Sequence, residues 1–350
     1  MAEAEFGSQR RVELINKIAA GAGGEIDQPL WAFLWLADIP QLEEISKQSY
    51  LATHLAGLAK SLEESQLLAR WTQRTRERTP SPTPSLAPTV SRHSEMAVPG
   101  DRPDSPTSSG MGTPRTRSKK AADLCRLRDS NRCVVTGADE PVEVAHIFPF
   151  SMRGLQAPHI VNAVYNPWNV LRMFWAQEKV DAWYNAITGP VATETVQNLM
   201  CLAPSVHKYH ERAYFALEPV EEDTQSHTLT VRFHWLPHMA NLRSLKVDTR
   251  PSFPPGIGCG RRIRLWEVVS GDEIISGTLI NITGHEGIPL PDPALLQLQW
   301  MLQRIVALAG GAEVFQESSD DGDDDDMHLD LPPPAASSLR RQLNVTLPVR

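Results

Sequence analysis

Two kinds of hydrophobic pattern divide the chain. Over residues 10–75 the apolar positions recur every three or four residues, which is the spacing of amphipathic helices. The leucines of one such stripe are Leu51, Leu55, Leu58 and Leu62. We expect this stripe to pack in a core or against a partner helix rather than to bind a cofactor. The pattern predicts a helical N-terminal module over residues 1–75 that could contact a protein partner.

Residues 76–120 and 313–350 lack this pattern. The first segment is rich in Pro, Ser and Thr, and it has too few large apolar residues to offset the entropy of ordering, so we predict a disordered basic linker. It ends in PRTRSKK, which fits a nuclear import signal, a phosphate-contacting arm or a plain solvated run. The second segment contains SSDDGDDDD, whose carboxylates repel one another, so we predict a disordered acidic tail.

From residue 121 the composition is that of a folded domain, in which strand patterns alternate with helical ones. We predict a short strand at 132–137 followed by a turn, a strand at 142–148, a helical stretch at 166–187, a strand at 198–202, a helix from 203 and a strand at 214–219. The large residues of the helical stretch that we expect in the core are Trp168, Leu171, Phe174, Trp175 and Trp183. The alternation predicts an α+β fold, with this domain extending over residues 121–312.

Charge and cysteine content narrow the class of protein. The net charge of −8 argues only weakly against a nucleic-acid partner, because many of the acidic residues gather in the predicted tail. The four cysteines, at positions 125, 133, 201 and 259, form no CxxC pair, so we expect buried, reduced thiols rather than zinc ligands. No apolar run reaches the ~18 residues of a membrane span, and the N-terminus lacks the apolar segment of a signal peptide. We therefore expect an intracellular protein of the nucleus or cytoplasm.

Two histidines and an asparagine stand at the ends of the predicted elements. His146 ends the strand VEVAHIF, Asn198 begins the strand NLMCL, and His207 lies in the helix that follows. Hydrolysis of a phosphodiester needs a base for the attacking water and a cation for the charge that develops on the phosphate oxygens. An imidazole can be that base or a metal ligand, and an asparagine can hold either the ring or the hairpin backbone. One histidine at a strand end is commonly only a half-buried structural residue. The hypothesis of a hydrolytic site therefore depends on His146, Asn198 and His207 together.

The stretches CVVTG, AHIFPF, NLMCL and HKYHERAYFALEP, taken in this order, resemble the HNH nuclease family, in the variant found in fungal proteins of unknown role. The resemblance covers about residues 121–310 and implies a ββα-metal (HNH) core, here elaborated with helices and extra strands. It implies His146 as general base, Asn198 as orienting residue and His207 as ligand of one divalent metal ion. It also implies nucleic acid as the partner, with DNA expected, and metal-dependent hydrolysis as the activity.

The sequence departs from the family pattern at Ala145, where many HNH nucleases carry an acidic metal ligand. Without that carboxylate, Mg²⁺ is less suited to the site than a transition ion or zinc, and we leave Mg, Mn, Ni and Zn open. His210 follows His207 by three residues, so both rings project from about the same helix face, either as a metal-binding pair or with His210 as a surface histidine. Arg153 and Arg172, near the site in the sequence, could contact phosphates or be ordinary surface residues.

Two alternatives to an endonuclease remain open. A catalytically silent HNH-fold module that binds nucleic acid or protein would account for Ala145, whereas His146, Asn198 and His207 favour the enzyme. The other alternative is a regulatory interaction protein in which the N-terminal helices and the linker carry the main function.

Overall fold

The computed structural model describes residues 5–72, 117–156, 165–188, 193–253, 263–285 and 287–310. The chain divides into one compact unit, Met1–Phe315, and a second, Gln316–Arg350, which lies wholly outside the described residues. Most of the predicted linker and all of the predicted acidic tail also lie outside them, so the disorder of both segments stays a prediction. The predicted domain boundaries likewise stay predictions.

Helices and short antiparallel strands alternate along the described residues, which confirms the α+β class. The helices are α1 (Gln9–Ala22), α2 (Gln28–Leu36), α3 (Ile39–Ser46), α4 (Leu51–Ser65), α5 (Leu67–Trp71), α6 (Lys119–Arg128), α8 (Pro167–Arg172), α9 (Gln177–Ile187), α10 (Pro204–Glu211) and α11 (Pro293–Leu308), with 3-10 turns η1 (Glu5–Gly7), η2 (Phe150–Gln156) and η3 (Val196–Asn198). The strands are β1 (Glu25–Asp27), β2 (Glu143–His146), β3 (Leu199–Leu202), β4 (Phe215–Asp223), β5 (Thr228–Trp235), β6 (Ser244–Lys246) and β7 (Leu279–Thr283). Among the described residues, β1 pairs with β6, β2 pairs with β3, and the third sheet has the order β4-β5-β7.

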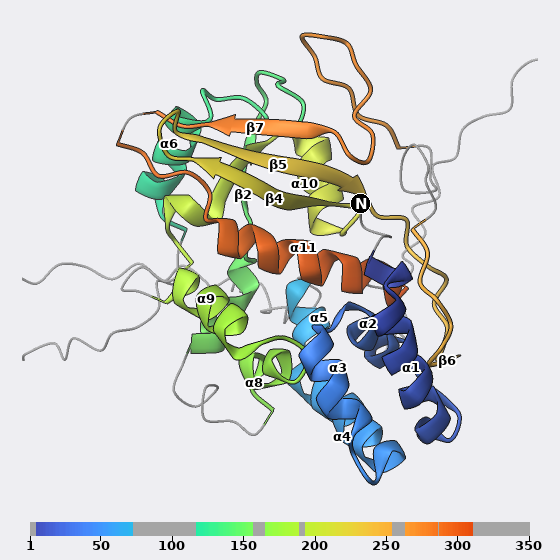
Figure 1. The fold of residues 1–350 in the computed structure, drawn as a ribbon. Coiled ribbons are helices and arrows are strands. Elements are labelled where there is room, and N and C mark those ends of the chain that lie inside the picture. Colours follow the sequence, from blue (N-terminus) through green and yellow to red (C-terminus); the bar gives the residue numbers. More distant parts are fainter. Residues whose placement is uncertain are drawn as a thin grey trace, which may run out of the picture. The chain divides into compact units, whose positions relative to one another are not determined.

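Helix α11 is the centre of the hydrophobic core. It begins with Asp292, whose side chain accepts a hydrogen bond from the Ala294 amide at 2.7 Å, and Pro293 follows at the first helical position. Most of its side chains are buried on every side, as expected of a helix that is apolar nearly all round. In Figure 1, α11 runs between the β4-β5-β7 sheet and the N-terminal helices.

The N-terminal helices share this core. The stripe predicted from the leucine spacing on α4 is buried, which confirms its packing role. Trp31 and Trp35 of α2 donate from their indole nitrogens to the carbonyls of Thr249 and Val247, at 2.8 and 2.9 Å. Gln28 donates to the carbonyl of Leu308 at the end of α11, at 2.7 Å. Helix α2 therefore packs directly on elements that come late in the chain.

The strand predicted at 132–137 is wrong, since these residues form a turn. The Cys133 amide donates to Ala138 and the Cys133 carbonyl accepts from Gly137, at 2.9 and 2.8 Å, so both backbone groups are used inside the turn. Gly137 adopts the left-handed φ of 70° that this closure requires. The β propensity of the two valines is overridden by this local hydrogen bonding.

The helical stretch predicted at 166–187 forms two helices, α8 and α9, because Asp38 inserts between them. The Asp38 amide donates to the carbonyl of Phe174 at 2.9 Å, and its carboxylate accepts from the Ala176 amide at 3.0 Å. Lys179 adds an ion pair to the same carboxylate at 2.8 Å. All five large residues predicted to lie in the core of this stretch are buried. The break comes from a tertiary contact that no local pattern announces.

Candidate functional site

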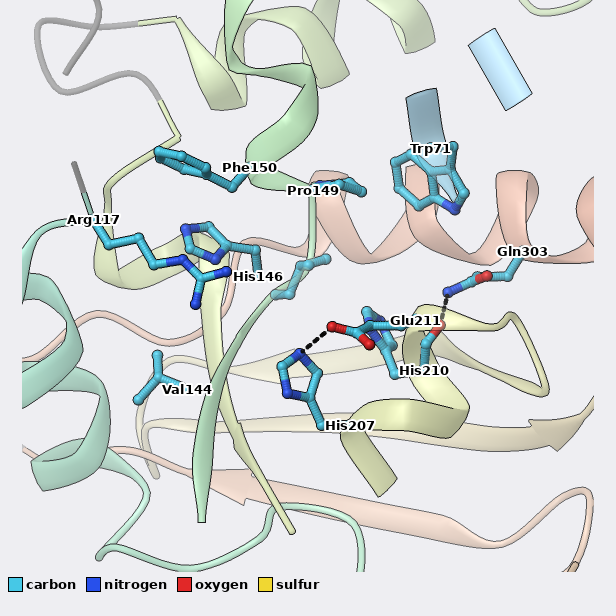
Figure 2. Close-up of a pocket in the computed structure, with 11 residues that line it drawn as sticks. Trp71, Arg117, Val144, His146, Pro149, Phe150, His207, His210, Glu211 and Gln303 are labelled. Carbon is cyan, nitrogen blue, oxygen red and sulfur yellow. Dashed lines mark hydrogen bonds and ion pairs between the residues drawn. The ribbon is translucent and has the colours of Figure 1, made fainter. Parts of the chain in front are cut away.

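One small pocket brings the predicted histidines together. It is lined by His146 from β2, by His207, His210 and Glu211 from α10, and by residues of other elements, among them Arg117. Figure 2 shows His146 beside Arg117 on one side of the pocket and the α10 residues on the other. The cavity has a volume of ≈ 20 Å³, enough for a water molecule or a single ion.

The β2–β3 ladder sets which side chains of β2 face this pocket. The strands are antiparallel, with Ala145 opposite Met200 and His146 opposite Leu199. Because side chains alternate between the two faces of a strand, Val144 and His146 share one face and both line the pocket, while Ala145, which is fully buried, shares the other face with Glu143. Glu143, two residues earlier on this face, contacts His207, so the absence of a carboxylate at position 145 does not by itself leave the site without one.

Asn198 holds the backbone that follows His146 and makes no hydrogen bond to the His146 ring. Its side-chain oxygen accepts from the Phe148 amide at 2.7 Å, and its nitrogen donates to the carbonyls of Phe148 and Thr193 at 3.1 and 3.0 Å. The Asn198 carbonyl accepts from the Ile147 amide at 2.8 Å. The sequence left two partners open for Asn198, the imidazole ring and the hairpin backbone. In the structure Asn198 bonds the backbone, and it fixes the residues that follow His146.

Glu194 is the residue that contacts the His146 ring, and sequence reasoning missed it. His146 Nε2 and Glu194 Oε1 lie 2.8 Å apart, and both side chains are almost fully buried. The other carboxylate oxygen accepts from the Ser118 amide at 2.5 Å. Burial alone would raise the pKa of the Glu194 carboxyl, but the hydrogen bonds from His146 and Ser118 lower it below its usual value.

This contact assigns the tautomer of His146. An ionised carboxylate can only accept, so Nε2 carries a proton, and the lone pair of the neutral ring lies on Nδ1. Glu194 stands four residues before Asn198 in a loop, where no periodicity distinguishes a functional carboxylate. Its position relative to the paired histidine becomes apparent only in three dimensions.

Two carboxylates flank His207, and neither was predicted from the sequence. Its Nδ1 lies 2.6 Å from Glu143 Oε2, and its Nε2 lies 3.4 Å from Glu211 Oε1. Glu211 is four residues after His207 on α10, so the spacing was a usable signal. Glu143 stands at the start of β2, and its approach to α10 depends on the packing of strand and helix.

His210 lies deeper in the same site. It is buried, and its Nε2 has no hydrogen-bond partner among the described residues. Burial, with the nearby charge of His207, lowers the pKa of His210 to about 3, so the ring is neutral at neutral pH. A neutral imidazole with an unused nitrogen is the form that binds a metal ion.

His207 and Glu211 are spaced like two ligands of one divalent cation. Glu143, by accepting the Nδ1 proton of His207, would leave Nε2 as the ligand atom, an arrangement common around metal-bound imidazoles. Nitrogen and oxygen ligands lie about 2.0–2.2 Å from such an ion, so two of them are roughly 3.0–3.4 Å apart. The 3.4 Å between His207 Nε2 and Glu211 Oε1 agrees with that spacing. His210 lines the same pocket, although His207, His210 and Glu211 do not place three ligand atoms within 4.8 Å of one another.

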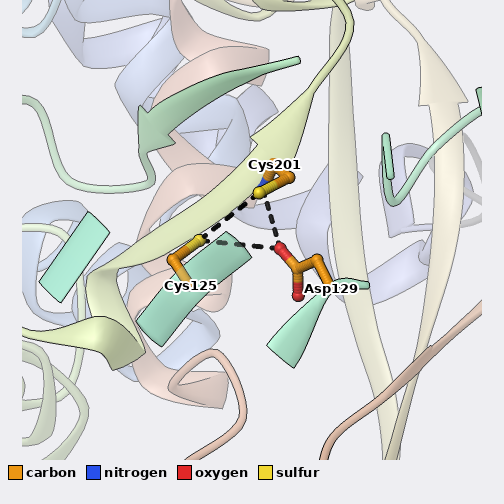
Figure 3. Close-up of side chains that lie close together, drawn as sticks. All are labelled: Cys125, Asp129 and Cys201. Carbon is orange, nitrogen blue, oxygen red and sulfur yellow. Dashed lines mark hydrogen bonds between the residues drawn. The ribbon is translucent and has the colours of Figure 1, made fainter. Parts of the chain in front are cut away.

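A second group of potential ligands, Cys125, Asp129 and Cys201, joins α6 to β3 (Figure 3). The two sulfurs are 3.8 Å apart, and Cys125 Sγ is 3.6 Å from Asp129 Oδ2. The Asp129 carboxylate already accepts from the Cys201 amide at 2.8 Å and from two nitrogens of buried Arg128 at 2.7 and 3.1 Å. The hydrogen bond with Cys201, together with burial, raises the pKa of the Cys125 thiol.

Protonated thiols and a buried guanidinium are unfavourable surroundings for a cation. We interpret the group as a packing link between α6 and β3. The prediction of buried, reduced thiols is confirmed for the described cysteines, Cys125, Cys133 and Cys201.

Comparison with protein families supports the resemblance seen in the sequence. Residues 133–218 match the family described as HNH endonuclease. The matched span contains His146, Asn198 and His207, as well as Glu194 and Glu211. Neither a curated protein nor a solved structure matches the chain. Among the described residues, no helix has the length and apolar character needed to cross a bilayer.

Proposed function

We propose that this chain, in which residues 133–218 form an HNH endonuclease domain, is a metal-dependent endonuclease that hydrolyses the phosphodiesters of nucleic acid, with DNA as the expected substrate. The observation that carries the proposal is that His146 and His207 line the same small pocket although they come from different elements. Their proximity provides a base and a cation ligand around one reacting phosphate, as this hydrolysis requires.

In the proposed reaction His146 is the general base. Its Nδ1 takes a proton from the water that attacks the phosphorus atom, and the ring becomes a cation. Glu194, ionised and bonded to Nε2, keeps the ring in the required tautomer and stabilises the positive charge that forms. Asn198 acts indirectly, because it fixes the backbone of Ile147 and Phe148, the two residues that follow His146.

We propose that His207 and Glu211 hold the divalent cation, that His210 joins them as a third ligand when the cation binds, and that Glu143 orients His207. A bound cation would stabilise the negative charge of the phosphate oxygens and of the leaving oxygen. Carboxylate favours Mg²⁺ and Mn²⁺ whereas imidazole favours Ni²⁺ and Zn²⁺, so this mixed set keeps all four ions as candidates. Glu143 and Glu211 also supply the negative charge that Ala145 cannot, which weakens the case for a silent module.

Nicking of supercoiled plasmid tests the proposal. We expect the purified full chain to convert supercoiled plasmid to the nicked form with at least one of Mg²⁺, Mn²⁺, Ni²⁺ and Zn²⁺, and not in EDTA. His146→Ala should reduce the rate by about 10²- to 10⁴-fold while its circular dichroism and melting temperature stay close to wild type. Undiminished nicking by this variant would exclude His146 as the base. DNA binding without cleavage under any of the four metals would instead support the binding module.

A further inference from the structure

Two arginines gather on one aromatic ring beside the proposed base. The guanidinium carbon of Arg153 lies 4.1 Å from the centroid of the Phe150 ring, and that of Arg117 lies 5.9 Å from it. The Phe150 ring is in turn 5.6 Å from the ring of His146, centroid to centroid. Figure 2 shows Arg117 and Phe150 around His146, on the side of the pocket away from His207. Positive charge is thus concentrated next to the base, opposite the proposed cation site.

These two arginines are not paired with carboxylates. Within the part of the chain that the structure describes, no carboxylate lies within 4.0 Å of the Arg117 or Arg153 nitrogens, although the charge of Arg117 acts at longer range on Glu194 and helps to lower the pKa of its carboxyl. Arg172, the other arginine that the sequence placed near the site, is paired with Asp181 at 2.7 Å. Two guanidinium groups that stay unpaired close together are electrostatically unfavourable unless an anion joins them.

Phe150 explains how the arginines are held in position without such an anion. The face of an aromatic ring attracts a guanidinium, so the ring orders two long side chains that would otherwise sample many rotamers. Arg153 is further fixed by donating from Nη1 to the Phe150 carbonyl at 3.2 Å. Ordered guanidinium groups are well suited to phosphate, because their planar N–H pairs match two phosphate oxygens.

We infer that Arg117 and Arg153, gathered on Phe150, bind a backbone phosphate of the nucleic-acid strand, next to the phosphodiester that is cleaved at His146. The inference rests on the proposed nuclease function and adds to it the residues that position the strand. Lys119 and Lys120, exposed at the start of α6, follow Arg117 by two and three residues and add positive charge to this segment. Contacts of this kind give affinity and register without reading base sequence.

Binding of a labelled DNA duplex in EDTA tests this inference without cleavage. Fluorescence anisotropy is measured with the full chain and a fluorescein-labelled 20-base-pair duplex over a series of KCl concentrations. We expect Arg117→Ala and Arg153→Ala each to raise the Kd for the duplex by about 3- to 10-fold near 0.1 M salt. The slope of log Kd against log [KCl] should fall by about 0.9 for each phosphate that the variant no longer binds. Phe150→Leu, which keeps an apolar side chain but removes the aromatic face, should weaken binding while both charges remain.

Arg132→Ala is the matched control, because Arg132 is exposed and paired with Asp139 at 2.8 Å. It should leave Kd and the salt slope unchanged. If Arg117→Ala and Arg153→Ala bind and cut like wild type, the inference is overturned while the nuclease proposal stands. If wild type does not bind the duplex at all, both are overturned. Binding that is weakened by the arginine variants in a protein that never cleaves would keep the inference and reject the nuclease.

Discussion

The imidazole of His146 donates from Nε2 to the carboxylate of Glu194 across 2.8 Å, with both side chains almost completely shielded from water. The two residues are 48 positions apart in the chain. One ends strand β2, and the other lies in the loop that leads to Asn198. Burial strengthens the electrostatic interaction between them, and the second oxygen of Glu194 is held by the Ser118 amide. The orientation of the proposed base is therefore set by a carboxylate from a distant part of the chain.

Glu194→Gln should lower the nicking rate by about 10- to 100-fold. The amide has no charge with which to stabilise a protonated His146, and by rotating it can donate to Nε2 and so favour the tautomer whose Nδ1 is protonated. The rate is measured at saturating metal and enzyme in excess. Calorimetric metal titration of the same variant should match wild type, because Glu194 is not one of the proposed metal ligands. A variant that cuts at the wild-type rate would show that Glu194 does not position the base.

The contrast between His146 and Glu194 shows what could be predicted from the sequence. His146, Asn198 and His207 stand in short stretches whose order resembles a family. His146 ends a strand, Asn198 immediately precedes one, and His207 lies in a helix. Glu194 and Glu143 have no such context, because their contacts depend on how a loop and a strand pack against distant elements. Carboxylates are common on surfaces, so neither could be singled out before the fold was known.

Position 145 shows how a correct observation can lead to an incomplete conclusion. Ala145 does depart from the family pattern, and taken alone it suggests that the site lacks a carboxylate. The structure brings Glu143 and Glu211 to His207 by other routes, one from two residues earlier on the strand and one from the next turn of the helix. A substitution at one position of a site predicts little about the site's charge until the neighbouring elements are placed.

Removal of the Glu211 carboxylate should weaken metal binding more than removal of the Glu143 carboxylate. Glu211→Gln deletes a proposed ligand, whereas Glu143→Gln deletes only the group that orients His207, for which a 10- to 100-fold loss is about the usual effect. Isothermal titration with Mn²⁺ and Zn²⁺ measures both. Glu222→Gln, an exposed carboxylate change on β4, is the control and should leave the affinity unchanged. Equal, wild-type affinity in Glu211→Gln would reject Glu211 as a ligand.

The substitution His210→Phe tests whether His210 is a metal ligand or only a packing residue. Phenylalanine fills a similar space beside Phe215, whose ring centroid lies 5.8 Å from that of His210, so the fold should be kept. The variant should be at least as stable as wild type at neutral pH, because a buried nitrogen without a partner is removed. We expect the Kd for Zn²⁺ to rise by at least about 10-fold, since the variant has one imidazole ligand fewer. Unchanged zinc affinity would mean that His210 serves packing alone.

Asn198→Ala should destabilise the protein by about 2–4 kcal/mol, because three buried hydrogen bonds to backbone groups are removed and those groups are left unsatisfied. Urea unfolding followed by tryptophan fluorescence gives the free energy of unfolding. Asn169→Ala, an exposed asparagine on α8, should change it by less than about 0.5 kcal/mol. If Asn198→Ala were as stable as wild type but inactive, Asn198 would have a direct catalytic role instead of a structural one.

The ionisation of Glu218, which lies outside the candidate site, should make the free energy of unfolding fall in acid. Its carboxylate accepts from His234 Nε2 and from Arg232 Nη1, each at 2.9 Å. The hydrogen bond and charge of His234, with those of Arg232, lower the pKa of Glu218 to about 2 despite partial burial. The folded pKa thus lies below the unfolded value of about 4.3. The stabilisation is complete above the unfolded pKa and is lost as the pH falls through 4 toward 2.

Glu218→Gln should therefore be less stable than wild type at pH 7, by about 1–3 kcal/mol, and the difference should shrink as the pH is lowered from about 5 to 2.5. Urea unfolding at successive pH values measures this difference, with Glu222→Gln on the same strand as the control for removal of one exposed negative charge. A constant difference across this range would mean that Glu218 is not ionised through its contacts with His234 and Arg232. Because Glu218 lies on the β4-β5-β7 sheet, nicking activity at neutral pH should be retained by the folded variant, which separates this effect from that of the carboxylates around His207.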